Sequence, residues 1–331
     1  MQNKTMKNSL FSSPGPNNKD EALILFFKGI CMGGADIIPG VSGGTIALIT
    51  GIYQQLLAAI KSIDINFLKK LFSFDIKAAI ETIHIRFLLV LFSGIIIAIV
   101  SLARLMNFLL KDYPEPTFSL FIGLIAASTF IIGKQVKWEL PSIIAITTGI
   151  GSAYVIVGLI PVSTPNDIWF IFLSGVIGIC AMILPGLSGA FILLILGKYE
   201  FITGTLKAPF SINEITGEHN LLIILIFCIG CTVGLGGFSR ILNWLLSKWH
   251  NITLAFLTGL MTGSMRKIWP WKGEAVVEII RGKEHIISQT NILPDTFGAT
   301  FALSLLLIIV GIVFIIVLDR ISNSTDKNPD Y

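Results

Sequence analysis

The sequence predicts an all-α polytopic membrane protein of two inverted-topology repeats, each a re-entrant, broken helical hairpin followed by about three transmembrane helices. Three observations support this fold class. The 331 residues are 53% hydrophobic and only 13% charged, whereas soluble chains carry about 25% charged residues. Several apolar stretches match the ~20 residues that a spanning helix needs. A polar, glycine-rich motif interrupts the apolar sequence twice, at 35–45 and at 181–190.

The apolar stretches give the order of the predicted spans. The four longest cover 87–107, 141–160, 221–239 and 297–318. Two shorter ones, at 118–132 and 252–265, fit only as tilted or protein-surrounded spans. We therefore expect four units: a disordered polar tail at 1–20, a first membrane repeat at 21–160, a second at 161–318, and a tail at 319–331. The N-terminal tail lacks an adjoining apolar run with a cleavage site, so it is interpreted as a soluble segment and not a signal peptide.

The two repeats are visible in the sequence itself. Residues 28–61 align with 174–207 without a gap, and thirteen of the 34 positions are identical. A second block pairs 94–128 with 230–264 and matches an Arg-x-x-Asn sequence in both. This self-similarity indicates a duplication. A repeat with one re-entrant segment and three spans crosses the membrane an odd number of times, so its copy is inserted upside down, as in many secondary transporters.

Basic residues predict the orientation. With the N-terminus inside, the cytoplasmic segments hold thirteen lysines and arginines and the outer segments hold eight. This bias has the sign that the positive-inside rule requires, and it places both termini in the cytoplasm. The expected outer loop at 266–296 fits least well, because it carries five of the eight outer basic residues.

Several kinds of site are disfavoured. The four histidines lie singly in predicted loops, and Cys228 and Cys231 have no further ligands nearby in the sequence. A metal site is therefore not expected, and the cysteines are interpreted as packing residues. No phosphate-binding loop motif of ATP-driven pumps occurs. We expect no cofactor, no nucleic-acid partner and no enzymatic activity.

The two broken segments are the candidate binding sites. Each contains a proline that removes a backbone donor and a glycine that permits unusual backbone angles, at Pro39-Gly40 and Pro185-Gly186. Ser42 or Ser188 then caps a new helix, whose first N–H groups favour an anion. The predicted phosphate-binding residues in these segments are Ser42, Gly43, Gly44, Thr45, Ser188 and Gly189. The alternative is that the Pro-Gly kinks only turn a hairpin or let helices pack closely.

Four charged residues complete the candidate site. Arg104 and Arg240 occupy matching places in the two repeats, where they would contact a phosphate or, alternatively, extend to the membrane interface. Lys28 and Asp36 are the charges within the first broken segment. Lys28 is a further phosphate candidate. Asp36 is the candidate for coupling transport to an ion, although it would equally serve to cap the turn.

Other repeated polar residues have further interpretations. Asn107 and Asn243 follow the arginines, and they would either bridge neighbouring helices, the favoured interpretation, or join the arginines in binding an oxygen. Tyr53 and Tyr199, each in a Gly-x-Tyr sequence, are of the kind found as interfacial anchors.

The first motif resembles a known family. The residues that carry the resemblance are Lys28-Gly29, Met32-Gly33, Ala35-Asp36, Pro39 to Thr45 and Gly51-Ile52-Tyr53, together with Pro185 to Gly189. They are similar to the undecaprenyl-phosphate transporter (PopT-type) family of bacteria, over residues 21–318. The resemblance implies a flippase of the cytoplasmic (inner) membrane, which returns undecaprenyl phosphate from the outer to the inner leaflet for reuse in peptidoglycan and other envelope polymers.

The resemblance also implies the partners. These are undecaprenyl phosphate, membrane lipids, protons or sodium as coupling ion, and a second copy of the chain if it forms a homo-oligomer. Two alternatives of other classes stay open, a membrane polyprenyl-diphosphate phosphatase and a carrier of a soluble anion. The phosphatases share a Pro-Gly-x-Ser motif but follow it with arginine, whereas glycine follows Ser42 and Ser188 here.

Overall fold

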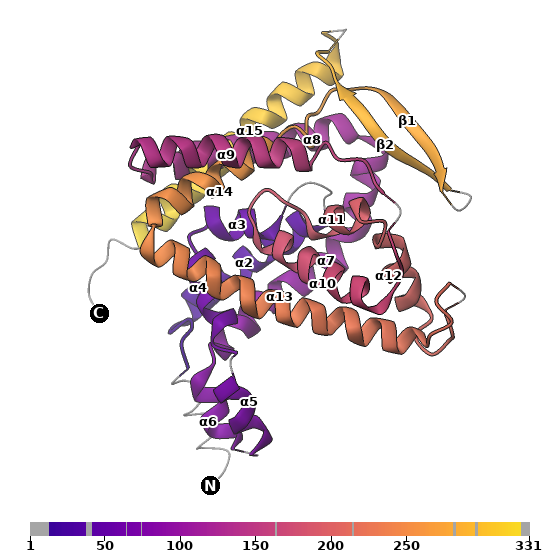
Figure 1. Ribbon diagram of the computed structural model, residues 1–331. Helices are drawn as coiled ribbons and strands as arrows, with labels where there is room; N and C mark the ends of the chain where they lie inside the picture. Colours follow the sequence, from indigo (N-terminus) through magenta and orange to yellow (C-terminus); the bar gives the residue numbers. More distant parts are fainter. Residues whose placement is uncertain are drawn as a thin grey trace.

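The computed structural model describes residues 13–37, 42–63, 65–73, 75–162, 164–213, 215–280, 283–294 and 297–325. These residues form fourteen helices and one two-stranded sheet (Figure 1). The first half contains α2 (Lys19–Asp36), α3 (Gly43–Ile49), α4 (Tyr53–Lys61), α5 (Ile65–Phe72), α6 (Ile76–Thr82), α7 (Ile85–Asp112), α8 (Pro114–Gln135) and α9 (Leu140–Ile156). The second half contains α10 (Ile168–Ile183), α11 (Gly189–Ile195), α12 (Tyr199–Lys207), α13 (Asn220–Lys248), α14 (His250–Ser264), β1 (Lys272–Ile280), β2 (Lys283–Asn291) and α15 (Ala299–Thr325).

Four helices are long and apolar enough to cross a membrane, and they confirm the polytopic helical fold. Their apolar parts are Ile85–Leu102, Pro114–Gln135, Asn220–Lys248 and Ala299–Val317. Two helix pairs pass the same test only together, because each is sharply bent: α3 and α4 meet at 118°, and α11 and α12 at 107°. Each bend follows a predicted break along the chain: the bends lie at residues 50–52 and 196–198, whereas the predicted proline-glycine breaks precede α3 and α11. If each bent pair is one span, the described residues hold up to six.

Helix pairing is the same in both halves. Helix α2 packs along α7, and its repeat counterpart α10 packs along α13. The remaining long helices pair between the halves, α8 with α15 and α9 with α14. Helix α8 corresponds to α14 in the aligned repeats, so the pair of α8 with α15 is equivalent to the pair of α14 with α9. The halves are therefore interlocked: the last two long helices of each half pack against the last two of the other half.

Matching glycines allow the closest of these approaches. A Cβ at Gly29 would collide with the backbone of Leu91 on α7, and one at Gly230 would collide with the backbone of Phe172 on α10. Gly29 and Gly94 face each other, as do their repeat counterparts Gly175 and Gly230. Small residues at such contacts let helix backbones approach closely in membranes, where packing drives association.

We expect Gly230→Leu to destabilise the protein, because backbone atoms of α10 cannot move aside for a side chain. Overpacking of this kind costs about 1–3 kcal/mol or more. Gly237 lies on the same helix and has open space at its Cβ position, so Gly237→Leu is the matched control. The measurement is thermal unfolding of both variants in detergent. Equal melting temperatures would contradict the close packing of α10 and α13.

The described residues begin at Ser13, before the predicted first repeat, and the first of them contact α7. Ser13 is fully buried, and its carbonyl accepts a hydrogen bond from Nε of Arg86 at 2.8 Å. Nη1 of Arg86 donates to the carbonyl of Pro16 at 3.0 Å. Residues 13–18 thus lie against the start of α7.

A β-hairpin occupies most of the segment that the sequence analysis assigns to an outer loop. Strands β1 and β2 pair antiparallel, from Lys272 opposite Asn291 to Ile280 opposite Lys283. Strand β1 is rich in valine and isoleucine, and β2 contains two adjacent isoleucines and a threonine, all residues that favour strands. In Figure 1 the hairpin lies at one end of the molecule, and α5 and α6 lie at the other.

Candidate functional site

The first break, between α2 and α3, is held by its own side chains. Oγ of Ser42 accepts a hydrogen bond from the backbone N–H of Gly44 at 3.1 Å, which is the predicted helix cap. Oδ1 of Asp36, the last residue of α2, accepts from the N–H of Gly43 at 2.6 Å. A Cβ at Gly43 would lie 2.6 Å from Oδ2 of the same carboxylate. A side chain at position 43 would therefore displace the carboxylate of Asp36 from the start of the new helix.

The second break, between α10 and α11, is built with the same cap but without an acid. Oγ of Ser188 accepts from the N–H of Phe191 at 3.4 Å. Gly186 adopts a φ of +86°, and a Cβ there would lie 2.8 Å from the carbonyl oxygen of Leu260 on α14. Met182 takes the place of Asp36 in the aligned sequence. Both new helices thus begin with a serine cap, but within the described residues only the first has a carboxylate at its start.

Hydrogen bonds join the two breaks directly. Ser42 is almost fully buried, and its hydroxyl lies 3.1 Å from the carbonyl of Met182. Oγ1 of Thr45 accepts from the N–H of Gly186 at 2.8 Å. The hydroxyl of Tyr53 donates to the carbonyl of Ile183 at 3.0 Å. Side chains of the first motif therefore satisfy backbone groups that the second break leaves without helical partners.

Gly44 is essential to this meeting. A Cβ at Gly44 would lie 2.6 Å from the carbonyl oxygen of Ile183, so any side chain would push the breaks apart. Helices α3 and α11 lie in the middle of the fold, surrounded by longer helices (Figure 1). The predicted convergence of the two motifs is present in the structure.

Helices α3 and α11 differ in how many of their first backbone N–H groups already have hydrogen-bond partners. At α3 the N–H groups of Gly43, Gly44 and Thr45 all have partners, supplied by Asp36 and Ser42. At α11 Ser188 accepts from Phe191 and Ile192, and no carboxylate bonds to its first turn within the described residues. A carboxylate of the protein thus already occupies the position at α3 where the sequence analysis placed part of the phosphate. The second break is the more open of the two to an anion.

The predicted cationic residues are distributed over the fold and do not gather at one point. Nζ of Lys28 donates to the carbonyl of Thr50 at 2.7 Å, so it sits at the C-terminal end of α3, where the helix dipole favours a cation. Arg104 is exposed on α7. Arg240 is half-buried on α13, and its Nη1 donates to the carbonyl of Gly236 at 2.6 Å. No hydrogen bond joins either arginine to a break among the residues that the structure describes.

Of the remaining predicted site residues, those at the second break, Pro185 and Gly189, are buried. A Cβ at Gly189 would lie 2.6 Å from the carbonyl oxygen of Gly178. Pro39 and Gly40 lie outside the described residues, as does the side chain of Asn107. Within the described part of the chain, no group of three or more His, Cys, Asp or Glu is placed to hold a metal ion.

Tyr53 has a role that the sequence analysis missed. It is 2% exposed and bonds to the second break, so its interpretation as an interfacial anchor is wrong. Its repeat counterpart Tyr199 is 42% exposed. The signal was available, because a tyrosine repeated eleven residues after each motif serine is as regular as the serines themselves.

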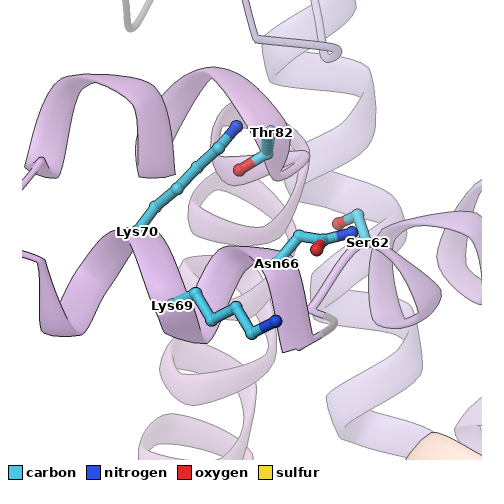
Figure 2. A pocket seen from close by; sticks show the side chains of 5 residues that line it. All are labelled: Ser62, Asn66, Lys69, Lys70 and Thr82. Carbon is cyan, nitrogen blue, oxygen red and sulfur yellow. The ribbon is translucent and has the colours of Figure 1, made fainter.

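A surface pocket of about 480 Å³ lies apart from these residues, at α5 and α6. Figure 2 shows the residues that line it, Ser62, Asn66, Lys69, Lys70 and Thr82, with the side chain of Lys70 reaching toward Thr82. None of the predicted site residues lines it. The pocket therefore adds nothing to the site at the breaks.

Two broken helices that bond to each other inside a bundle of apolar helices define a multi-pass membrane protein with discontinuous helices, an architecture that secondary transporters use. The chain belongs to the VCA0040-like family, described as undecaprenyl phosphate translocase-like, whose match covers residues 32–285. This membership confirms the resemblance seen in the first motif.

Two relatives carry transporter names. The chain is 38% identical over 306 residues to a polyprenyl-phosphate transporter of Vibrio cholerae, covering 90% of this chain and 96% of the relative. It is 28% identical over 261 residues to a polyprenyl-phosphate transporter of Staphylococcus aureus, covering 75% of this chain and 86% of the relative. No solved structure matches the chain. The relatives' names agree with the prediction that the chain is a transporter and not an enzyme.

Proposed function

We propose that this protein transports a polyprenyl phosphate, returning undecaprenyl phosphate from the outer to the inner leaflet of the bacterial cytoplasmic membrane for envelope polymer synthesis. The observation that supports this proposal most is the pair of helix breaks joined by Ser42, Thr45 and Tyr53 in the middle of the fold. Breaks at membrane depth occur where the backbone is buried in protein or lines a polar path, and the proposal assigns these two to a path. A long isoprenoid chain can stay in the lipid while only its phosphate follows that path.

The second break is the proposed phosphate position. The first turn of α11 has no carboxylate partner among the residues that the structure describes, and Ser188 and Gly189 lie at its start. In this proposal Ser42, Gly43, Gly44 and Thr45 shape the same path from the opposite side, and Lys28 contributes positive charge at the far end of α3. The chain crosses the membrane with both termini inside, and its two halves, 21–160 and 161–318, are inserted in opposite senses.

Ion coupling is assigned to Asp36. It is the carboxylate at the junction of the breaks, and it holds the N–H of Gly43. Exchange of an anionic lipid between leaflets needs no acid, whereas coupled transport needs a group that changes charge or binds a cation. Protons and sodium are both compatible with a single carboxylate.

The proposed function is tested by headgroup translocation with purified protein in liposomes. Undecaprenyl phosphate, undecaprenyl diphosphate and inorganic phosphate are compared, with and without an imposed proton or sodium gradient. We expect movement of the monophosphate lipid, no release of phosphate from the diphosphate, and no uptake of inorganic phosphate. Phosphate release would identify a phosphatase, and uptake of inorganic phosphate would identify a soluble-anion carrier.

Arg104 and Arg240 are proposed to contact the phosphate at opposite ends of the cycle. Replacing either by lysine keeps the charge but removes the planar fork that binds two phosphate oxygens. We therefore expect Arg104→Lys and Arg240→Lys to lower the translocation rate about tenfold, the loss of roughly one charge-assisted hydrogen bond. Arg320→Lys, an exposed arginine near the end of α15, is the control. Unchanged rates in the lysine and alanine variants of both arginines, at matched expression, would leave them as interfacial arginines.

A further inference from the structure

A group of three basic residues lies outside the two breaks, where α14 ends and the β-hairpin begins. We call Arg266, Lys267 and Lys272 the basic foot of the hairpin. Nζ of Lys272 donates to the side chain of Asn291 at 2.6 Å and to the carbonyl of Arg266 at 3.3 Å. Nδ2 of Asn291 donates to the same carbonyl at 2.9 Å. Both strands of the hairpin are thus fixed to the turn after α14.

The other two side chains of the basic foot reach across to neighbouring helices. The guanidinium of Arg266 lies 4.1 Å from the ring centre of Tyr154 on α9, and its Nη1 donates to the Tyr154 carbonyl at 2.9 Å. The ammonium of Lys267 lies 4.3 Å from the ring centre of Phe191, in the first turn of α11. The basic foot therefore lies beside the second break.

Positive charge is concentrated in the basic foot, and no carboxylate is paired with it within the described residues. The partners of its side chains are carbonyls, an amide and aromatic rings. Burial lowers the pKa of Lys267 from its usual value. Burial, and then the charges of Lys267 and Arg266, lower the pKa of Lys272 to about 8. The three cations are close enough to repel one another, which a bound anion would relieve.

Structural roles account for only part of this arrangement. Arg266 satisfies a carbonyl at the end of α9, and Lys272 satisfies one just after α14, where cations are favourable. Lys267 has no such role, because within the described residues its ammonium has an aromatic ring and no hydrogen-bond acceptor. Nε1 of the neighbouring Trp271 is likewise buried without a partner in the described structure. The ammonium of Lys267 and Nε1 of Trp271 are therefore two hydrogen-bond donors without an acceptor in the described structure.

The surroundings favour an anion that carries an apolar chain. Trp271 packs against Phe301 at the start of α15, with ring centres 5.8 Å apart. Leu293 and Phe297, in the link between the hairpin and α15, are 76% and 80% exposed. Phe297 packs against Phe301, with ring centres 5.0 Å apart, so a series of aromatic contacts joins Phe297 to Trp271 next to Lys272. An anionic headgroup that carries an apolar chain would meet both kinds of side chain.

We propose that the basic foot is a second phosphate-monoester site, at which the headgroup of a lipid phosphate is captured beside the second break before it enters the path between the breaks. Lys267 and Arg266 contact the phosphate oxygens, and the exposed Leu293 and Phe297 face the lipid chain. This inference rests on the proposed function, since it assigns the entry step of the same transport.

The test measures binding separately from transport. Purified protein is titrated with undecaprenyl phosphate in detergent, and the change in tryptophan fluorescence gives the Kd. Lys267→Gln is expected to weaken binding about tenfold, the loss of roughly one charge-assisted hydrogen bond. Lys248→Gln is the matched control, because Lys248 also lies over an aromatic ring, 4.9 Å from the centre of Trp249. Lys267→Arg is expected to bind as the unaltered protein does. That result would show that Lys267→Gln weakens binding through the loss of charge and not through altered packing.

The outcomes separate the two proposals. An unchanged Kd in Lys267→Gln overturns the capture site, whatever its transport rate. Weakened binding in Lys267→Gln together with no translocation by the unaltered protein upholds the site and contradicts the proposed transport. Inorganic phosphate is titrated in parallel. If it binds as tightly as the lipid, the assignment to a lipid headgroup is overturned.

Binding should also fall as the pH rises through about 8, because Lys272 then loses its proton and the basic foot loses one of its three charges. The charged or titratable groups around that ammonium are Arg266 and Lys267 from the turn, Tyr154 from α9, and Glu274 two residues along β1. A phosphate monoester is already a dianion above pH ~7. Measured between pH 7 and 9, Lys272→Gln should bind more weakly at pH 7 and lose the pH step. A step that persists in Lys272→Gln would contradict the role of Lys272.

Discussion

An Asp36→Asn variant is expected to bind undecaprenyl phosphate as the unaltered protein does, but to lose the response of translocation to an imposed proton or sodium gradient. The amide oxygen of asparagine can accept the hydrogen bond that Gly43 now donates to the carboxylate at 2.6 Å. The cap on α3 and the meeting of the two breaks are therefore kept. What asparagine cannot do is take up a proton or balance a cation. The measurement is translocation in liposomes with and without each gradient.

Two further variants make this result interpretable. Asp20→Asn, at the exposed opposite end of α2, is the control for a change of charge alone. Asp36→Ala removes the acceptor as well as the charge, and loss of such a cap costs about 0.5–2 kcal/mol. If Asp36→Asn weakens lipid binding and leaves the gradient response intact, Asp36 organises the site and the coupling group lies elsewhere.

Thr45→Val is the second variant for which we expect a large effect. Valine has nearly the shape of threonine but no oxygen, so the N–H of Gly186 would lose the acceptor that now lies 2.8 Å away. Thr45 is fully buried, and an unsatisfied buried donor costs about 1–3 kcal/mol. We expect a lower melting temperature and a translocation rate reduced about tenfold, because 1.4 kcal/mol spent on separating the breaks is a tenfold change in equilibrium.

The control for Thr45→Val is Thr129→Val on α8. The hydroxyl of Thr129 donates to the carbonyl of Ile125 at 2.8 Å, within its own helix. Its loss leaves no tertiary partner unsatisfied. Equal stability and equal rates in the two valine variants would show that the bond between Thr45 and Gly186 does not hold the breaks together.

Much of the fold follows from the sequence because its signals are local and strong. Apolar stretches of spanning length and two proline-glycine interruptions are enough to predict long helices and the breaks before α3 and α11. The bends within the pairs α3–α4 and α11–α12 lie instead at Gly51 and Gly197, which adopt positive φ. Repetition of the motif predicts that the second break is built like the first. The interlocked pairing of α8 with α15 and α9 with α14 could not be predicted, because similar apolar helices give no indication of which partner each will choose.

The candidate site was predicted in its serines but not in its electrostatics. Ser42 and Ser188 cap their helices as their position after proline and glycine indicates. That Asp36 would fill the start of α3 depends on how the chain turns between the helices, which spacing alone does not determine. The basic foot was counted in the sequence as an excess of charge in a loop. The turn between α14 and β1 brings Lys272 back to Arg266, and the hairpin brings Asn291 to the same carbonyl.

The interlocked halves have a consequence for synthesis of the protein. Helices α8 and α9 are made well before α14 and α15, the helices against which they pack. During translation, the contact faces of α8 and α9, including Gly123 and Gly149, therefore remain in the membrane without partners until α14 and α15 have been made. The first half therefore cannot reach its final packing alone, and the C-terminal helices complete both halves at once. A chain interrupted late in translation would lose its stability in both halves together.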